Sequence, residues 1–219
     1  MVLLLHGGVW RSGDPGSMVA HKQDFEAHGY RTRNVAYPLG DVAASIDDVD
    51  AIAQQERLRG APVIAYGVSA GGTIAAALGA AGRVDGSVDV IGPTDFTRWV
   101  SPVGVTSMLA LGMSNAEKVS LSPYWRLRGR QAPQLLQCGL ADPVTTYDQC
   151  TRYVAQAAAG NPDTTLQAML NAHAQWSGDR DRARAWLQAR WPASRASARR
   201  HPPASTRRLR LSQRPRPTD

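Results

Sequence analysis

Short apolar runs alternate with longer amphipathic stretches over most of this chain of 219 residues. Such an alternation is typical of repeated β-α units around a mostly parallel sheet, so the fold class is predicted to be α/β. Apolar residues recur near the helical period after Asp41, which is placed to cap a helix that runs to residue 58. The predicted strands are 2–5, 31–37, 62–66, 88–91, 134–138 and 165–170, and the other predicted helices are 70–81, 145–159 and 181–191.

The excess positive charge lies at one end of the chain. The formal net charge is +7, and residues 192–219 hold eight arginines, five prolines and one acidic residue. This segment has too few apolar residues to offset the entropy of ordering, so we predict a disordered basic tail after a domain of residues 1–191. Its arginines are not interleaved with aromatic residues, which argues against specific binding of nucleic acid. A weak, salt-sensitive anchor for nucleic acid or an anionic membrane is the alternative.

The interval 92–133 does not follow the regular alternation. It carries Pro93, Pro102, Pro123 and an apolar group at 108–113. An insertion that follows a strand's carboxyl end lies above the place where α/β proteins bind ligands, so we predict a cap or lid segment here. The two cysteines, Cys138 and Cys150, fit neither a disulfide framework nor a metal-binding pattern, and they are predicted to be small buried residues.

A G-x-S-x-G motif at Gly67–Gly71 provides the strongest chemical signal. A β-branched run ends at Gly67, and an alanine-rich helical pattern starts after Ser69. This context of strand, sharp turn and helix is the one in which glycines allow a serine to project as a nucleophile. Ser69 is therefore the candidate nucleophile.

A serine hydroxyl needs a base to remove its proton and an acid to orient that base. Asp142 follows the predicted strand 134–138, and His173 follows the predicted strand 165–170. Both therefore lie at the carboxyl edge of the sheet, where Ser69 is expected. The order Ser69, Asp142, His173 is the order of catalytic triads on this type of sheet.

Other acids and histidines compete for these roles. Asp95 also follows a strand and is the main rival for the acid, whereas Asp148 is predicted on a helix face. Among the histidines, two fall in a polar stretch that is predicted to be a surface helix, and one lies in the tail. The remaining candidates are Asp163 as an acid and, as histidines, His21, His28 and His201.

Acyl transfer requires N–H donors for the oxygen that becomes negative. Glycines at the end of the first predicted strand let the backbone come close to a substrate. The predicted oxyanion hole consists of the backbone N–H groups of Gly8, Val9 and Ala70. His6 is predicted to brace this loop through hydrogen bonds rather than to act as a base.

Five segments in this order resemble the α/β-hydrolase superfamily, and the resemblance covers residues 1–191. They are His6-Gly7-Gly8-Val9-Trp10, the segment 67–72, Gly92-Pro93-Thr94-Asp95, the segment 139–144 and His173. The H-G-G-x-W and G-x-S-A-G-G forms are most similar to its esterase and lipase branch, including carboxylesterases and arylformamidases. The resemblance implies Ser69 as nucleophile, His173 as general base and then acid, and Asp142 as the group that orients it. It implies no metal and no organic cofactor.

Two features depart from that family's pattern. Relatives have further strands before the H-G-G strand, so the sheet is expected to lack its N-terminal edge strands. Val9 stands where many relatives carry glycine, and its branched side chain is expected to narrow the acyl pocket and favour short acyl groups. Candidate substrate-binding residues are Trp10, Trp99 and Trp176, each with core packing as the alternative.

The sequence therefore predicts a serine hydrolase that cleaves a small carboxylic ester through an acyl-enzyme. An arylformamidase or another amide or peptide hydrolase with the same triad is the alternative. From a different class, an inactive or truncated scaffold with an anion-binding tail is a third interpretation. No apolar run approaches the roughly 20 residues of a membrane span, and no signal peptide is recognisable, so a cytoplasmic location is expected.

Overall fold

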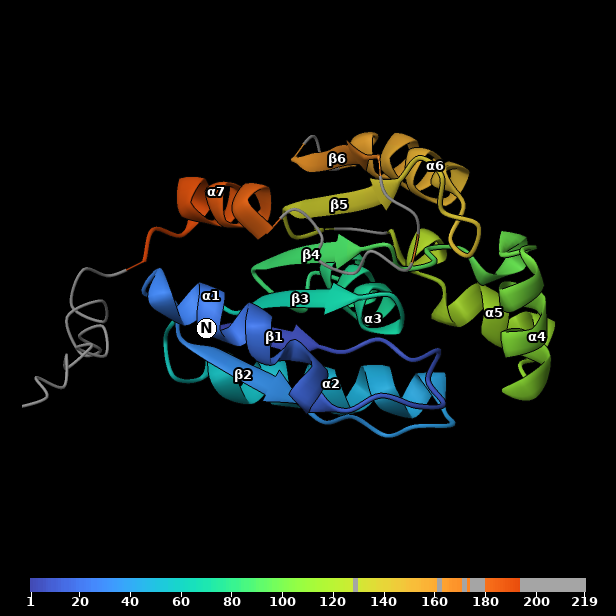
Figure 1. The fold of residues 1–219 in the computed structure, drawn as a ribbon, viewed down its shortest axis with the longest axis horizontal. Coiled ribbons are helices and arrows are strands. Elements are labelled where there is room, and N and C mark those ends of the chain that lie inside the picture. The colour runs from blue at the N-terminus through green and yellow to red at the C-terminus, as the bar shows by residue number, and fades with distance from the viewer. Residues whose placement is uncertain (128–129, 161–162, 171–172, 174–179, 194–219) are drawn as a thin grey trace, which may run out of the picture.

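The computed structural model describes residues 1–127, 130–160, 163–170, 173 and 180–193. Its strands form a parallel sheet in the order β2-β1-β3-β4-β5-β6. Figure 1 shows the chain beginning at the amino end of this sheet. The strands are β1 (Val2–Leu5), β2 (Thr32–Val35), β3 (Ile64–Val68), β4 (Gly86–Val90), β5 (Gln134–Gly139) and β6 (Thr164–Met169).

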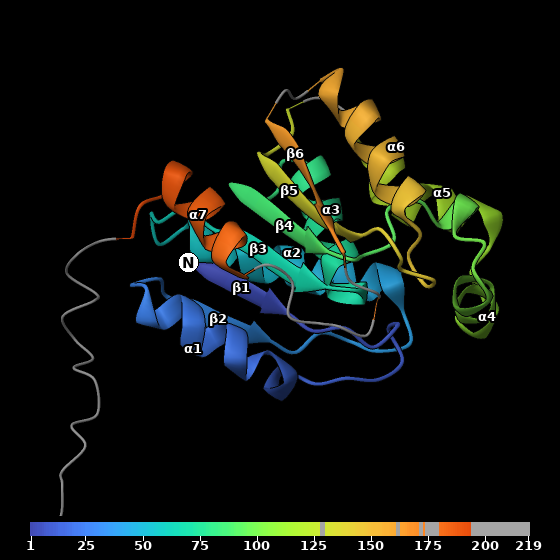
Figure 2. The same ribbon diagram turned by 45° about the horizontal axis from the view of Figure 1, so that its top comes forward.

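Helices cover both faces of the sheet (Figure 2). Side chains of α2 and α3 pack on one face, where α6 also lies, and side chains of α1 and α7 pack on the other. The predicted α/β class is therefore confirmed. The helices are α1 (Val19–Ala27), α2 (Val42–Arg57), α3 (Ala70–Ala80), α4 (Pro102–Ala110), α5 (Asn115–Leu121), α6 (Tyr147–Ala158) and α7 (Arg180–Arg190).

The predicted elements are recovered with small shifts at their ends. Asp41 caps α2, and its Oδ1 accepts the backbone N–H of Ala44 at 3.0 Å. The strand predicted at 62–66 lies two residues later, because the chain stays extended through Gly67 and Val68 up to Ser69. The strand predicted at 31–37 is shorter, and Tyr37 lies beyond its end.

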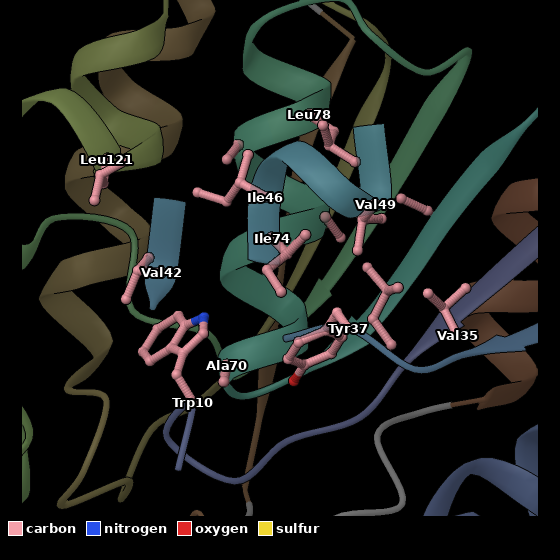
Figure 3. Close-up of a cluster of buried hydrophobic side chains, with 14 of the residues drawn as sticks. Trp10, Val35, Tyr37, Val42, Ile46, Val49, Ala70, Ile74, Leu78 and Leu121 are labelled. Atoms are coloured by element: carbon pink, nitrogen blue, oxygen red, sulfur yellow. The ribbon is translucent and has the colours of Figure 1, made fainter. Parts of the chain in front are cut away.

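The larger core lies between the sheet and helices α2 and α3 (Figure 3). Ile46 of α2 and Ile74 of α3 meet there, next to the ring of Tyr37. Every residue of α3 is buried, which explains why this helix is so rich in alanine and glycine: small side chains let it lie close to the strands. The amino end of α3, which follows Ser69, is therefore held by packing on all sides.

The interval 92–133 folds into α4, α5 and two short 3₁₀ turns, at Phe96–Arg98 and Pro123–Arg126. Figures 1 and 2 place α4 and α5 beyond the carboxyl ends of the strands. The α1 region differs from its prediction as a surface helix, because His21 and Phe25 are buried against Tyr66. Residues 194–219 of the predicted tail lie outside the described part of the chain.

Candidate active site

Ser69 stands at a sharp turn between β3 and α3. Its φ is +55° and its ψ is −118°, a region that residues with a side chain rarely adopt. A Cβ on Gly67 would overlap the backbone of Gly71, and a Cβ on Gly71 would lie 2.6 Å from the carbonyl oxygen of His6. Both glycines of the motif are therefore required by close backbone contacts, and the strain at Ser69 is the kind that proteins keep at functional positions.

The structure brings Ser69, His173 and Asp142 together. The Oγ of Ser69 lies 3.2 Å from Nε2 of His173, and Nδ1 of His173 lies 2.7 Å from Oδ2 of Asp142. The other carboxylate oxygen of Asp142 accepts the backbone N–H groups of Val144 at 2.8 Å and of Thr145 at 2.9 Å. Such a chain of contacts can draw the proton from the serine hydroxyl and stabilise the imidazolium that results.

The rival acids are engaged elsewhere. Asp95 is buried, caps the turn at Phe96–Arg98 and lies 3.3 Å from the guanidinium of Arg152. Asp148 is exposed near the start of α6, as predicted. Asp163 pairs with Arg190 of α7.

The loop after β1 is braced as expected. The hydroxyl of Tyr37 donates to the carbonyl oxygen of His6 at 2.6 Å, and the two rings stack with centroids 4.3 Å apart. Nδ1 of His6 lies 2.7 Å from the carbonyl oxygen of Gly7. Burial raises the pKa of Tyr37, so its hydroxyl stays protonated and able to donate.

The backbone of this loop is strained at the predicted oxyanion donors. Gly8 has φ +123°, and a Cβ there would overlap the backbone of Ser12. Val9 has φ +50°, which is rare for a β-branched residue. Ala70 is the first residue of α3, so its N–H has no acceptor within the helix.

The predicted substrate-binding tryptophans have different surroundings. Trp10 is fully buried and packs edge-on against Phe96 and Trp99, so it belongs to the core. Trp99 lines a groove of about 330 Å³ between α4 and α5, with Phe96 and Met108 beside it. Lys118 stands among the otherwise mainly apolar lining. Trp176 lies outside the described residues.

The prediction for the two cysteines was wrong, because Cys138 and Cys150 form a disulfide. Sequence spacing did not reveal it, since β5 and the first turn of α6 approach each other only after the loop between them has folded back. Both residues are buried, as expected. Disulfides are uncommon in the cytosol, so this bond counts against the cytoplasmic location that the sequence suggested.

The burial of two titratable residues was not predicted from the sequence. Asp89 lies in β4, and burial raises its pKa to about 8. His21 lies in α1, and burial lowers its pKa to about 4. The charged residue within the apolar run Val88-Asp89-Val90 was a signal for the first, whereas nothing in the polar stretch around His21 indicated its burial.

The described residues contain no group of three or more His, Cys, Asp or Glu side chains that could hold a metal ion. None of the helices among them has the length and apolar character needed to cross a membrane.

A parallel sheet that carries a serine at a strained turn, followed by an acid and a histidine, defines the class of α/β hydrolases. Residues 23–191 match the family described as the prolyl oligopeptidase family, and the chain belongs to that family. It is therefore a serine hydrolase of the type that acts on esters or peptides. A search of curated protein sequences gave no match.

Solved structures with a similar fold include esterase 2 from Thermogutta terrifontis. The propionate-bound form has a TM-score of 0.74 at 18% identity, covering 88% of this chain and 84% of that one. The butyrate-bound form has a TM-score of 0.75 at 17% identity, covering 89% and 84%. The form phosphonylated by sarin has a TM-score of 0.78 at 16% identity, covering 88% and 84%. At these identities the likeness establishes the α/β-hydrolase fold.

Proposed function

We propose that this protein cleaves small carboxylic esters through an acyl-enzyme formed on Ser69. The observation that carries the proposal is the continuous contact from the Oγ of Ser69 through both ring nitrogens of His173 to the carboxylate of Asp142. In the first step His173 takes the hydroxyl proton while Oγ attacks the ester carbonyl. His173 then gives this proton to the departing alcohol, and water attacks the acyl-enzyme by the same route.

Asp142 is proposed to orient His173 and to stabilise its positive charge. Its carboxylate is buried and accepts two backbone N–H groups through Oδ1, which leaves Oδ2 directed at the histidine. These bonds hold the carboxylate in one orientation, so it needs little rearrangement when the imidazolium forms.

The oxyanion that develops on the substrate is proposed to receive the N–H groups of Ala70, Gly8 and Val9. Support comes from the N–H at the start of α3, which has no acceptor within the helix, and from the positive φ angles of the β1 loop, which turn its backbone in a way that extended residues cannot. Each such donor lowers the barrier by about 3 kcal/mol. Short acyl groups are proposed as the preferred substrates, in line with the propionate and butyrate bound to the Thermogutta esterase, whereas the side chain of Val9 packs against the core.

Amide or peptide cleavage is the second candidate, because the family is described by its oligopeptidases. The same three side chains serve both reactions, so the surroundings of Ser69 decide which substrate reacts. The groove between α4 and α5, which is lined in part by Trp99, Phe96 and Met108, is proposed to take an aromatic or aliphatic group of either substrate. Turnover of an N-formyl arylamine tests whether the amide activity is that of an arylformamidase.

The experiment compares wild type with Ser69→Ala on p-nitrophenyl acetate, p-nitrophenyl butyrate, an N-formyl arylamine and a proline p-nitroanilide. A fluorophosphonate probe counts the reactive serines. We expect turnover of the esters and one label per chain, both lost in Ser69→Ala and both kept in Ser120→Ala, which removes an exposed hydroxyl on α5. Faster turnover of an amide than of the acetate would favour the second candidate.

Wild type that folds but neither turns over an ester nor takes the label would refute the proposal. That outcome would favour the inactive scaffold instead, and binding of the basic segment 192–219 to an anionic partner would then be the activity to measure.

A further inference from the structure

We propose that the Cys138–Cys150 disulfide positions the catalytic acid, so that the thiol form of the enzyme turns over substrate more slowly. The inference rests on the proposed function, because it assigns the disulfide a part in holding Asp142 against His173. It adds dependence on the redox state to a reaction whose proposed mechanism contains no redox step.

The disulfide closes the loop that carries Asp142. Cys138 is the last residue but one of β5, and Cys150 lies in the first half of α6, with a sequence separation of 12 and Cα atoms 6.5 Å apart. Asp142 lies between them, after the end of β5 and before the start of α6. The bond therefore joins the two elements from which this loop leaves the body of the protein.

The hydrogen bonds of Asp142 do not replace this connection. Its Oδ1 accepts N–H groups of Val144 and Thr145, which belong to the same loop. Its own N–H reaches the carbonyl oxygen of Gly139 at 3.4 Å, a long hydrogen bond at the base of the loop. These contacts fix the carboxylate relative to its loop, whereas the position of the loop relative to His173 depends on how β5 and α6 are held together.

Other contacts hold parts of the loop to different elements. The carbonyl oxygen of Val144 accepts from Nε1 of Trp99 and from the hydroxyl of Ser101, both at 2.7 Å. Gln149, next to Cys150, bonds to the backbone of Thr94 and Asp95 after β4. These bonds lead to the cap segment and to the loop after β4. The disulfide adds a covalent link to β5, the strand that pairs with the one preceding His173.

The side chains packed around the disulfide connect it mechanically to the loop that carries Asp142. Cys138 and Cys150 are buried in one cluster with Leu136, Tyr153 and Ala157. Packed interiors have few voids and pass displacements on to their neighbours. Release of this link therefore lets the start of α6 shift against β5, and the Asp142 loop shifts with it. A displacement of about 1 Å in a catalytic group costs up to about 100-fold in rate.

The chemistry of the change is a thiol-disulfide exchange. Dithiothreitol supplies two electrons and two protons, the S–S bond breaks, and the two sulfurs become thiols while the reagent closes its own disulfide ring. Because the bond is buried, reduction is followed by counting free thiols. The variant Cys138→Ala/Cys150→Ala gives the unlinked protein without any reagent.

The experiment measures kcat and KM for p-nitrophenyl acetate with oxidised, reduced and reoxidised wild type and with the double alanine variant. The temperature is kept well below the melting transition of each protein. We expect kcat to fall about 10- to 100-fold in the reduced protein and in the variant, with KM for this small ester little changed. Reoxidation restores the wild type, and dithiothreitol has no effect on the variant.

Tyr153→Leu serves as the matched control for stability. Tyr153 is buried in the same cluster and donates to Gln134 at 2.9 Å, but it lies on α6 after the loop has ended. We expect this variant to melt at lower temperature, as the double alanine variant does, and to keep its kcat. The downfield proton resonance of the hydrogen bond between His173 and Asp142 gives a direct reading, and we expect it to broaden or disappear only in the unlinked proteins.

A double alanine variant that melts earlier yet keeps the kcat and the downfield resonance of wild type would overturn the inference, since the disulfide would then serve stability alone. The inference also fails if Tyr153→Leu loses as much kcat as the unlinked protein. Failure of the proposed function is a different result: oxidised wild type would then show neither ester turnover nor labelling at Ser69.

Discussion

Asp89 makes the stability of this protein depend on pH in an unusual direction. Its side chain lies in the middle of the sheet and is 1% exposed. Oδ1 accepts the backbone N–H of Gly92 at 2.8 Å, whereas Oδ2 is buried and has no hydrogen-bond partner among the residues that the structure describes. Burial disfavours the charged carboxylate and raises the pKa of Asp89 from 3.8 to about 8.

The sign and size of the effect follow from proton linkage. Between the two pKa values the native chain holds a proton on Asp89 that the unfolded chain releases, so the contribution of Asp89 to stability is fully present below pH 3.8 and is lost as the pH rises to about 8. The slope is about 1.4 kcal/mol per pH unit. From pH 5 to pH 7, Asp89 therefore removes about 2 to 3 kcal/mol from the free energy of unfolding.

The variant Asp89→Asn isolates this contribution. Asparagine is neutral, has nearly the same shape and keeps an oxygen for the N–H of Gly92. The free energy of unfolding of the variant minus that of wild type is therefore expected to increase by about 2 to 3 kcal/mol when the pH is raised from 5 to 7. Urea unfolding followed by tryptophan fluorescence at both pH values measures it, with the disulfide intact. Asp47→Asn, which removes an exposed carboxylate on α2, is the control.

The difference between variant and wild type is the decisive quantity, because other groups titrate over the same range. A difference that stays constant within about 0.5 kcal/mol from pH 5 to pH 7, far below the change that linkage requires, would refute the reasoning and show that Asp89 is already ionised in the native protein.

Three further predictions concern single residues. Burial lowers the pKa of His21 from 6.5 to about 4, so its contribution to stability is present above pH 6.5 and is lost as the pH falls towards 4. At pH 5 this lowers the free energy of unfolding by about 2 kcal/mol, and urea unfolding of His21→Leu should show that this loss is absent. Gly71→Ala places a Cβ against the carbonyl oxygens of Leu5 and His6, and we expect the free energy of unfolding to fall by about 3 kcal/mol and the melting temperature to fall with it. The control is Gly112→Ala, whose Cβ meets no atom within 4 Å, and we expect it to lose less stability despite its positive φ. Asp142→Asn should keep the circular dichroism spectrum and melting curve of wild type, whereas kcat for p-nitrophenyl acetate falls about 10⁴-fold because the histidine loses its orienting partner.

The order of elements was predictable because each depends on local sequence. The β-branched run before Gly67 and the alanine-rich run after Ser69 specify a strand and a helix without help from the rest of the chain. Asp41 marks the start of α2 through a hydrogen bond to a residue only three positions away. Element ends were less accurate, since neighbouring strands decide how far a strand continues to pair.

The positions of the candidate site residues could also be inferred, because parallel strands bring their carboxyl ends to one edge. Ser69, Asp142 and His173 each follow such a strand, so their meeting is a consequence of topology. Trp10 was harder to place, because a large aromatic residue after a glycine loop fits a binding site as well as a core. Its contacts with Phe96 and Trp99 come from a segment about 90 residues away along the chain.

The α/β class, the order of strands along the chain and the candidates for the proposed chemistry were thus predictable from the sequence, since these depend on local propensity and on the geometry of parallel sheets. The bond between Cys138 and Cys150, the burial of His21 and Asp89, and the pairing of Asp95 with Arg152 instead of with a histidine became visible in the folded structure. Each of these depends on the distance between elements that are not neighbours in sequence, and that distance is set by packing.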